Sequence, residues 1–273
     1  MCTIQHRTMS SGPGGATRPD KMRPITPQQL RHRQVDIWTL APERVQEAGR
    51  LDLLQSILSA EERSRHRRFR CTEAAHQYLV AHGMLRSVLS RYADIPPADW
   101  QFTYGEHGRP EIANPAYVSL RFNLTHTAGL IACVIVRDRA CGIDAEHCIA
   151  RRHILGVARR MFSAQEYEAL ERAGDDARLE GFYTGWTLRE AYVKARGIGI
   201  SFPTRKLDFT VRGEGDISLS QAPDIDGSGD DWQFRLVRPT ADHLMAVAVE
   251  LGRDADVRFN LREFRFEQPT TGS

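Results

Sequence analysis

The stretch that decides the fold runs from Leu130 to Glu146 and reads LIACVIV, then RDRA, then CGIDAE. The unbroken apolar run Leu130–Val136 predicts a strand. It is far shorter than the ~20 residues that a membrane-spanning helix needs. The segment Cys141–Glu146 predicts a second strand, and Arg137-Asp-Arg139 between them predicts a hairpin that joins the two.

Segments of the same kinds, in the same order, occupy the chain on both sides of this stretch. Upstream, Ser59-Ala-Glu-Glu62 is a capping box that starts a short helix. The other upstream elements are a strand over 35–40, a longer helix over 72–92 and strands over 100–104 and 118–124. Downstream, Ser163-Ala-Gln-Glu166 is a second capping box. It precedes a longer helix over 178–196 that ends at Gly197, and strands over 207–211, 232–237 and 244–251.

The repeated order predicts an α+β fold of two pseudo-duplicated halves, each a small, mostly antiparallel sheet packed with a long helix. We expect the active site at the seam, because clefts form where two such units meet. Residues 1–33, rich in Ser, Gly, Pro and Thr, predict a disordered tail. The other expected boundaries are an N-terminal half over 34–125, a C-terminal half with the metal site over 126–252 and a C-terminal tail over 253–273.

Composition narrows the class of protein. A chain of 273 residues with 41% hydrophobic residues is long enough for one large domain or two small ones with a real core. Its net charge of +2 disfavours bulk affinity for nucleic acid. Five cysteines, an odd number without a CxxC pair, argue against a disulfide or zinc framework. With no signal-peptide pattern at its start, the chain is expected to be cytoplasmic, without a membrane partner.

Two carboxylates share one face of the strand Cys141–Glu146. Side chains alternate along a strand, so Asp144 and Glu146 project one way while Ile143 and Ala145 project the other. Two such carboxylates repel each other unless a cation lies between them, and hard oxygen ligands suit Mg²⁺. A solvated strand edge is the alternative interpretation, since a lone DxE is common.

A second cluster lies on the predicted helix 178–196. Trp186, Glu190 and Lys194 follow one another at intervals of four and therefore share a helical face. The chain has only three lysines, Lys21, Lys194 and Lys206, so a lysine here suggests that a compact ammonium group is needed. The alternative is the ordinary Glu–Lys pair of an exposed helix surface.

Three further segments carry polar groups that suit phosphate. Thr125 and His126 directly follow the strand 118–124 in the sequence FNLTH, and Gly108-Arg109-Pro110 forms a turn shortly before that strand. The run Arg63–Arg70 is strongly basic and suits a terminal phosphate, a solvated helix face or RNA. For His126, the alternative interpretation is a histidine whose hydrogen bonds are satisfied within a turn. The GxSxG, HExxH and GxGxxG patterns of other enzyme classes are absent from the sequence.

Taken together, in this order and spacing, these segments resemble the 4′-phosphopantetheinyl transferases of the surfactin-synthetase-activating type. The likeness runs from about Leu58 to Glu250. It is carried by LSAEERSRHRRF (58–69), GRP (108–110), FNLTH (122–126), GIDAE (142–146), FSAQE (162–166) and WTLREAYVKA (186–195). The GIDAE and WTLREAYVKA segments, about forty residues apart, form a specific signature that neither makes alone.

The resemblance implies a role for each matching residue. Metal ligands are expected at Asp144, Glu146 and Glu190, and catalytic groups at Glu190 as general base, Lys194 and His126. Coenzyme A contacts are expected at Arg65, Arg109, Pro110, Thr125, His126 and Lys194. The sequence departs from the family pattern at Arg109 and Arg189, where lysine is usual, at Ala145, which is small, and at Glu62, where some relatives carry a basic phosphate contact.

The resemblance also implies the reaction and its partners. It is a Mg²⁺-dependent transfer of 4′-phosphopantetheine from coenzyme A to a serine of an acyl or peptidyl carrier protein, releasing adenosine 3′,5′-bisphosphate. The enzyme would be a monomer that serves fatty-acid, polyketide or nonribosomal peptide synthesis. Such a reaction needs charge neutralisation and positioning rather than an enzyme nucleophile.

Carriers are generally acidic, so we expect them to dock on a basic segment with apolar contacts. That segment contains Arg151, Arg152, Arg159, Arg160, Met161 and Phe162. Two rival functions stay open: a Mg²⁺-dependent phosphodiester hydrolase built on the same carboxylates, and an RNA-binding protein that uses Arg63–Arg70. A non-catalytic relative is a third alternative, disfavoured because the three carboxylates are all present.

Overall fold

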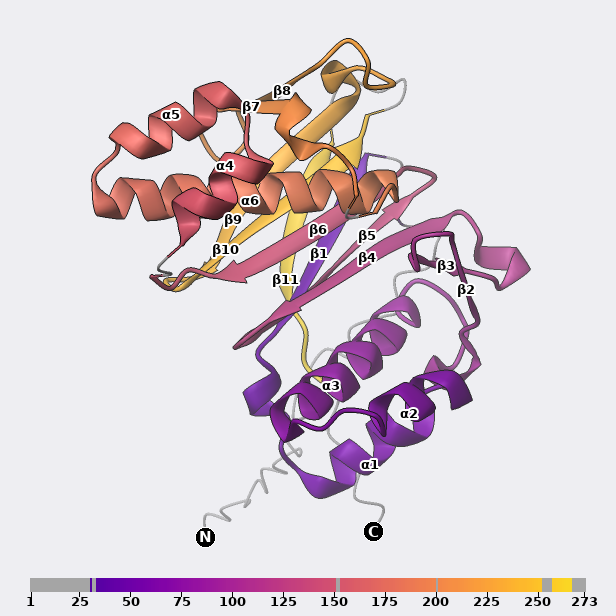
Figure 1. The fold of residues 1–273 in the computed structure, drawn as a ribbon. Helices are drawn as coiled ribbons and strands as arrows, with labels where there is room; N and C mark the ends of the chain where they lie inside the picture. Colours follow the sequence, from indigo (N-terminus) through magenta and orange to yellow (C-terminus); the bar gives the residue numbers. More distant parts are fainter. Residues whose placement is uncertain (1–29, 31–32, 151–152, 200, 252–256, 267–273) are drawn as a thin grey trace, which may run out of the picture.

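The structure is a computed structural model that describes residue 30 and residues 33–150, 153–199, 201–251 and 257–266. Two sheets lie in its middle, with three helices covering one end and three the other (Figure 1). Within the described residues, no helix has the length and apolar character needed to span a membrane.

The first sheet has the strand order β11-β1-β5-β4. Its strands are β1 (Gln34–Leu40), β4 (Leu120–Thr127), β5 (Leu130–Arg137) and β11 (Arg258–Glu263). β1 pairs in parallel with β11 and antiparallel with β5, which pairs antiparallel with β4. The polar sequence of β11 is held because Asn260 and Arg262 reach the buried carboxylate of Asp36 on β1, at 2.8 and 3.6 Å.

Three helices, α1 (Ala48–Ile57), α2 (Ala60–His66) and α3 (Thr72–Leu89), cover one face of this sheet (Figure 1). A short hairpin of β2 (Phe102–Tyr104) and β3 (Pro110–Ile112) follows them. The core on this side gathers apolar side chains from the helices and the sheet, among them Trp38, Met84, Leu85, Phe122, Cys133 and Ile135.

The second sheet has the antiparallel order β6-β10-β9. Its strands are β6 (Cys141–His147), β9 (Trp232–Thr240) and β10 (His243–Glu250). The long helix α6 lies against it, with α4 and α5 beyond and a β7–β8 hairpin at the side (Figure 1). The bounds of these five elements are α4 (Ile154–Met161), α5 (Ala164–Arg172), α6 (Asp175–Arg196), β7 (Leu207–Val211) and β8 (Ile217–Gln221).

The two sheets pack against each other over a separate apolar core. Ala132 and Val134 of β5 meet Ile143 and Ala145 of β6 in it, together with Val35, Ile37, Met245 and Val247. The intervening residues of β5, Ile131, Cys133 and Ile135, face the N-terminal helices. β5 is therefore buried on both faces, which explains its unbroken apolar sequence.

The predicted hairpin between Leu130–Val136 and Cys141–Glu146 is wrong. β5 has β1 and β4 as its two neighbours, while β6 pairs with β10 in the other sheet. The connecting residue Arg139 instead bonds the carbonyl oxygens of Glu250 and Leu251. Strand partners are chosen by the shared core rather than by closeness in sequence, so a short connection was a misleading signal.

The structure also differs from the expected boundaries. β4 runs through the predicted limit at 125/126, and β5 belongs to the sheet of the N-terminal half. The predicted C-terminal tail contains β11, beside which Val257 and Phe264 are buried. Within the predicted N-terminal tail, Leu30 is buried; residues 1–29 and 31–32 lie outside the described residues.

Several local predictions are confirmed. Both capping boxes form, with Ser59 and Glu62 at the start of α2 and Ser163 and Glu166 at the start of α5. The two longer helices are α3 and α6, and α6 ends at Gly197 in the left-handed conformation, with φ of 64°. The helices α1 and α4 have no counterpart in the sequence analysis.

Candidate active site

Gly142 brings the helix α6 onto the strand β6. A Cβ atom at this position would lie 2.5 Å from the amide nitrogen of Ala195, and closer still to the carbonyl oxygen of Ala191. Only glycine lets the backbones of helix and strand approach so closely. The side chains of α6 are thereby held against those of β6.

Lys194 of α6 joins three elements through one ammonium group. Its Nζ atom lies 2.6 Å from Oδ1 of Asp144, 3.3 Å from the carbonyl oxygen of Ile143 and 3.3 Å from Oγ1 of Thr125 on β4. Oγ1 of Thr125 in turn lies 3.4 Å from Oδ1 of Asp144. Asp144 is only 6% exposed, and its second oxygen, Oδ2, has no hydrogen-bond partner among the described residues.

The other predicted carboxylates face the same space. Nε1 of Trp186 donates a hydrogen bond to Oε1 of Glu146 at 3.1 Å. Burial raises the pKa of Glu190, and the negative charges of Asp144 and Glu146 raise it further, against the opposing effect of Lys194. The predicted sharing of a strand face by Asp144 and Glu146, and of a helix face by Trp186, Glu190 and Lys194, is confirmed.

The carboxylates do not form a ready-made cage. Among the described residues, no three His, Cys, Asp or Glu side chains stand where they could hold a metal ion together. Asp144 is engaged by Lys194 and Glu146 by Trp186. The predicted metal site therefore stays a prediction.

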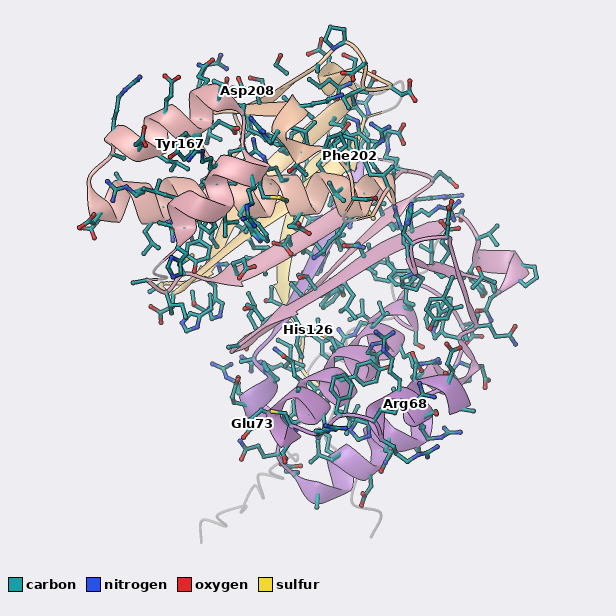
Figure 2. The ribbon with its side chains drawn as sticks, viewed as in Figure 1. Arg68, Glu73, His126, Tyr167, Phe202 and Asp208 are labelled. Carbon is teal, nitrogen blue, oxygen red and sulfur yellow. The ribbon has the colours of Figure 1, made fainter. Side chains whose placement is uncertain are left out.

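Thr125 and His126 project to opposite sides of β4. Thr125 reaches β6, as does Asn123, whose Oδ1 accepts a hydrogen bond from the amide of Ile143 at 3.0 Å. His126 instead lies on the side of β4 that faces α3 (Figure 2). His126 is exposed on one side, but the atoms around it partly desolvate the imidazole and so lower its pKa; the neighbouring positive charges of His82 and Lys194 lower it further.

The remaining predicted contacts lie on other elements. Arg109 donates to the carbonyl oxygens of Lys194 at 3.0 Å and Cys141 at 3.2 Å, and also to that of Ala195, so it caps the end of α6. Pro110 begins β3 beside it. The exposed Arg65 of α2 lies 6.0 Å from the centre of the Tyr78 ring.

Sequence reasoning missed the buried partners of Glu62. Its carboxylate accepts a hydrogen bond from Nε of Arg86 at 2.8 Å, lies 3.0 Å from Nδ1 of His82 and caps α2. Glu62 therefore has a structural role. The capping box was a visible signal for this role, but its pairing with Arg86 was not.

One expected docking contact is wrong. Phe162 is only 2% exposed, because its ring stacks on Phe182 and packs against the guanidinium of Arg189. Arg159 and Arg160 of α4 are exposed as expected, whereas Arg151 and Arg152 lie outside the described residues. Apolar exposure nearby comes from Ile149 and Val157 instead, which are 48% and 37% exposed.

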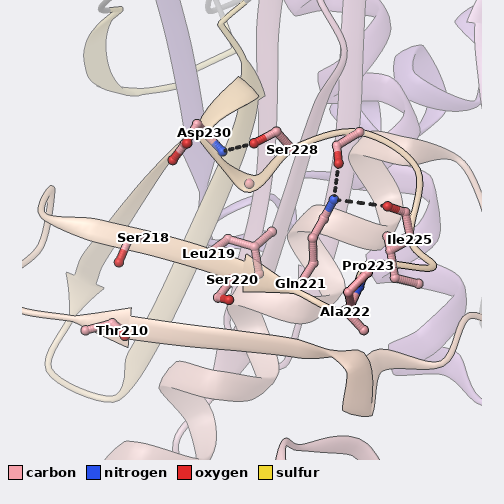
Figure 3. A pocket seen from close by; sticks show the side chains of 12 residues that line it. Thr210, Ser218, Leu219, Ser220, Gln221, Ala222, Pro223, Ile225, Ser228 and Asp230 are labelled. Atoms are coloured by element: carbon pink, nitrogen blue, oxygen red, sulfur yellow. Dashed lines mark hydrogen bonds between the residues drawn. The ribbon is translucent and has the colours of Figure 1, made fainter.

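A separate polar hollow lies beside the β7–β8 hairpin, lined by residues that include Thr210, Ser218 and Ser220 (Figure 3). Gln221 turns its amide group onto the carbonyl oxygens of Ile225, at 3.5 Å, and Gly227. None of the residues predicted to bind metal or coenzyme A lines this hollow.

Comparison with known proteins defines the class. Residues 140–248 match the family model of the 4′-phosphopantetheinyl transferase superfamily, and residues 46–136 match that of the N-terminal part of a 4′-phosphopantetheinyl transferase. The 4′-phosphopantetheinyl transferase HetI of a Nostoc species is 32% identical over 217 residues, covering 79% of this chain and 87% of that protein. The 4′-phosphopantetheinyl transferase Sfp of Bacillus subtilis is 31% identical over 62% of this chain and 73% of its own length.

A solved holo-[acyl-carrier-protein] synthase from Helicobacter pylori, in complex with coenzyme A, aligns with 38% of this chain and 99% of its own. Its sequence is 14% identical to this chain, with a TM-score of 0.30. The sequence matches suffice: the chain belongs to the 4′-phosphopantetheinyl transferase superfamily and is a transferase. The predicted resemblance to the surfactin-synthetase-activating family is thereby confirmed.

Proposed function

We propose that this enzyme transfers 4′-phosphopantetheine from coenzyme A to a serine of an acyl or peptidyl carrier protein and releases adenosine 3′,5′-bisphosphate. The observation that carries the proposal is the convergence of Asp144, Glu146, Glu190 and Lys194, from β6 and α6, on one space beside β4. A pyrophosphate is a substrate that such a mixture of carboxylates and ammonium suits, provided a cation offsets the carboxylates.

Asp144, Glu146 and Glu190 are the residues that would hold Mg²⁺. Two observations support the fit. Oδ2 of Asp144 is buried without a hydrogen-bond partner among the described residues. The negative charges of Asp144 and Glu146 also raise the pKa of Glu190, which shows that the three carboxylates repel one another. Hard oxygen donors are the ligands that this ion prefers. When bound, Mg²⁺ would neutralise charge on the pyrophosphate oxygens.

Glu190 is the proposed general base. A raised pKa makes a carboxylate a better acceptor of a serine proton at neutral pH. The serine Oγ would form a bond to the β-phosphorus of coenzyme A while the bond from that phosphorus to the bridging oxygen breaks. The proton passes to Glu190, and the electron pair leaves with adenosine 3′,5′-bisphosphate. Lys194 would donate to phosphate oxygens from this space, and His126 would donate from the other side of β4, where it still feels the charge of Lys194.

We also propose that the two halves are a structural duplication with the active site at their seam. The same device occurs in each half: the glutamate of a capping box pairs with a buried arginine of the following long helix. These pairs are Glu62 with Arg86 and Glu166 with Arg189. Because one chain supplies all the proposed metal ligands and coenzyme A contacts, we propose that the enzyme acts as a monomer.

The proposed carrier surface is the exposed part of α4 and the segment before it. It consists of Ile149, Val157, Arg159 and Arg160, which follow β6 in sequence and combine apolar and positive side chains. Positive charge suits an acidic carrier and raises its rate of association. Reversing the charge of Arg159 and Arg160 should raise the KM for the carrier and leave coenzyme A binding unchanged.

The test of the function is the intact mass of an apo carrier protein incubated with this enzyme, coenzyme A and Mg²⁺. The expected result is a mass increase of one phosphopantetheine per carrier serine, abolished when that serine is replaced by alanine. Release of phosphopantetheine to water without a carrier would instead favour the hydrolase, and an unchanged carrier mass would contradict the proposal. The pathway that supplies the carrier and the cytoplasmic location stay predictions from the sequence.

A further inference from the structure

His243 begins β10 in the C-terminal half but reaches a turn of the other sheet. Its side chain is buried, and Nε2 lies 2.7 Å from the carbonyl oxygen of Ala128. Ala128 and Gly129 form the two-residue turn between β4 and β5, directly after Thr127. This turn therefore closes the strand that carries Thr125 and His126.

The hydrogen bonds of His243 define one tautomer. A carbonyl oxygen can only accept, so Nε2 must carry the hydrogen that points at Ala128. Nδ1 lies 2.7 Å from Oγ1 of Thr240, and that hydroxyl accepts from the amide of Asp242 at 3.2 Å. The Thr240 hydroxyl is thus free to donate to Nδ1, and the neutral imidazole is satisfied at both nitrogens.

The imidazole of His243 also fits the shape of the turn. Gly129 has a φ of 80°, which glycine adopts readily. A Cβ atom at Gly129 would lie 3.2 Å from Cε1 of His243, so the ring packs directly on the turn. On its other side the ring stacks on His147, with centroids 5.1 Å apart, and His147 follows Glu146 on β6.

The turn is also held from the N-terminal half. Nε2 of Gln77 on α3 donates a hydrogen bond to the carbonyl oxygen of Thr127. One side chain from each half thus bonds a backbone carbonyl at the end of β4. Both bonds lie within three residues of Thr125, the group that Lys194 and Asp144 contact.

We propose that His243 is a positioning residue, which fixes the β4–β5 turn so that Thr125 and His126 stand at a set distance from Asp144 and Glu146. The inference rests on the proposed function, in which Asp144 and Glu146 would hold Mg²⁺ at the pyrophosphate while Thr125 and His126 contact coenzyme A. A donor held rigidly in place binds a phosphate more tightly than one that must be ordered on binding. His243 would not itself touch the substrate.

The test measures binding of coenzyme A by calorimetry and the KM for coenzyme A with an apo carrier, in wild type and variants. His243→Leu should raise both the dissociation constant and KM about tenfold or more. His243→Gln retains a terminal N–H donor and should recover most of that loss. Thr240→Val, which removes only the partner of Nδ1, should give an intermediate effect and serves if His243→Leu does not fold.

His76→Leu is the matched control. Its Nε2 also bonds, at 3.0 Å, a backbone carbonyl, that of Pro42, which follows β1 and is not part of the β4–β5 turn. We expect it to lower stability while KM for coenzyme A stays within twofold of wild type. The proposal is overturned if His243→Leu and Thr240→Val change KM no more than His76→Leu does. A wild-type enzyme that modifies no carrier would instead overturn the proposed function, whatever the variants do.

Discussion

Gly142 is the residue on which the geometry of the site depends most directly. Gly142→Ala would place a Cβ atom 2.5 Å from the amide nitrogen of Ala195, so α6 must move away from β6. We expect a destabilisation of about 1–3 kcal/mol, as for overpacked cores, together with loss of transfer activity. Urea unfolding followed by circular dichroism measures the first effect.

Gly156 provides the control for this substitution. It lies within α4, and a Cβ atom there would meet nothing within 4 Å. Gly156→Ala should therefore stabilise the helix by roughly 0.5–1 kcal/mol. If Gly142→Ala is as stable and as active as wild type, the close approach of α6 to β6 is not what holds the site.

The lowered pKa of Glu62 should make the stability of the protein depend on pH. Burial alone would raise its pKa, but hydrogen bonds from His82 and the amide of Ser59, and the charge of Arg86, lower it from 4.5 to about 2. The folded state thus binds this proton more weakly than the unfolded state. The resulting stability is fully present above pH 4.5 and is lost as the pH falls towards about 2.

Glu62→Gln should remove this pH dependence and destabilise the protein at neutral pH by about 3 kcal/mol, because Arg86 loses its buried counter-charge. Equilibrium unfolding from pH 7 to pH 3 tests both effects. A wild-type and a variant curve that run parallel across this range would contradict the role given to Glu62.

At the scale of single residues, the sequence predicted which side chains share a face of a strand or helix, because local periodicity decides this. The period of two placed Asp144 and Glu146 together, and the period of 3.6 placed Trp186, Glu190 and Lys194 together. It did not predict that Arg109 caps α6 or that Glu62 pairs with Arg86, because both contacts join elements that are distant in sequence.

At the scale of the elements, α5 and α6 are joined by Arg189. Its guanidinium donates to the carbonyl oxygens of Met161, Gly185 and Leu207 at 2.9–3.0 Å and pairs with Glu166. Lysine has three donors from a single nitrogen and cannot reach acceptors spread in this way. Arg189→Lys should therefore cost about 1–3 kcal/mol.

Arg172→Lys is the matched control for Arg189→Lys. Arg172 forms an exposed pair with Glu168 within α5, 2.8 Å apart, and such pairs contribute about 0.3–0.5 kcal/mol at most. Thermal unfolding of the two variants compares them directly. Equal melting temperatures for both would show that the buried network around Arg189 does not join the two helices.

The helices and strands were predictable to different degrees. α3, α6 and both capping boxes follow from apolar spacing and end signals that are local to the sequence. The pairing of β5 with β1, and of β6 with β10, was not predictable, because it depends on the core that the two sheets share. β11 was not predicted, because its sequence is polar and its contact with the buried Asp36, through Asn260, joins residues distant in sequence.

At the scale of the whole molecule, the two sheets meet with β4 beside β6, and most of the predicted catalytic side chains gather along that line. Asn123 and Thr125 cross it from one side, bonding the amide of Ile143 and the carboxylate of Asp144. Lys194 joins both strands to α6. Transfer is therefore expected to depend on carboxylates that only the assembled molecule brings together.

The most direct measurement is the rate of phosphopantetheine transfer, by intact mass of an apo carrier, for wild type, Asp144→Asn, Glu190→Gln and Glu180→Gln. Glu180 lies on the same helix and pairs with Arg238, so it controls for the loss of a carboxylate on α6. We predict that Asp144→Asn and Glu190→Gln fold normally and lose at least about a hundredfold in rate, while Glu180→Gln retains wild-type activity. Wild-type rates in a folded Asp144→Asn or Glu190→Gln enzyme would contradict the account.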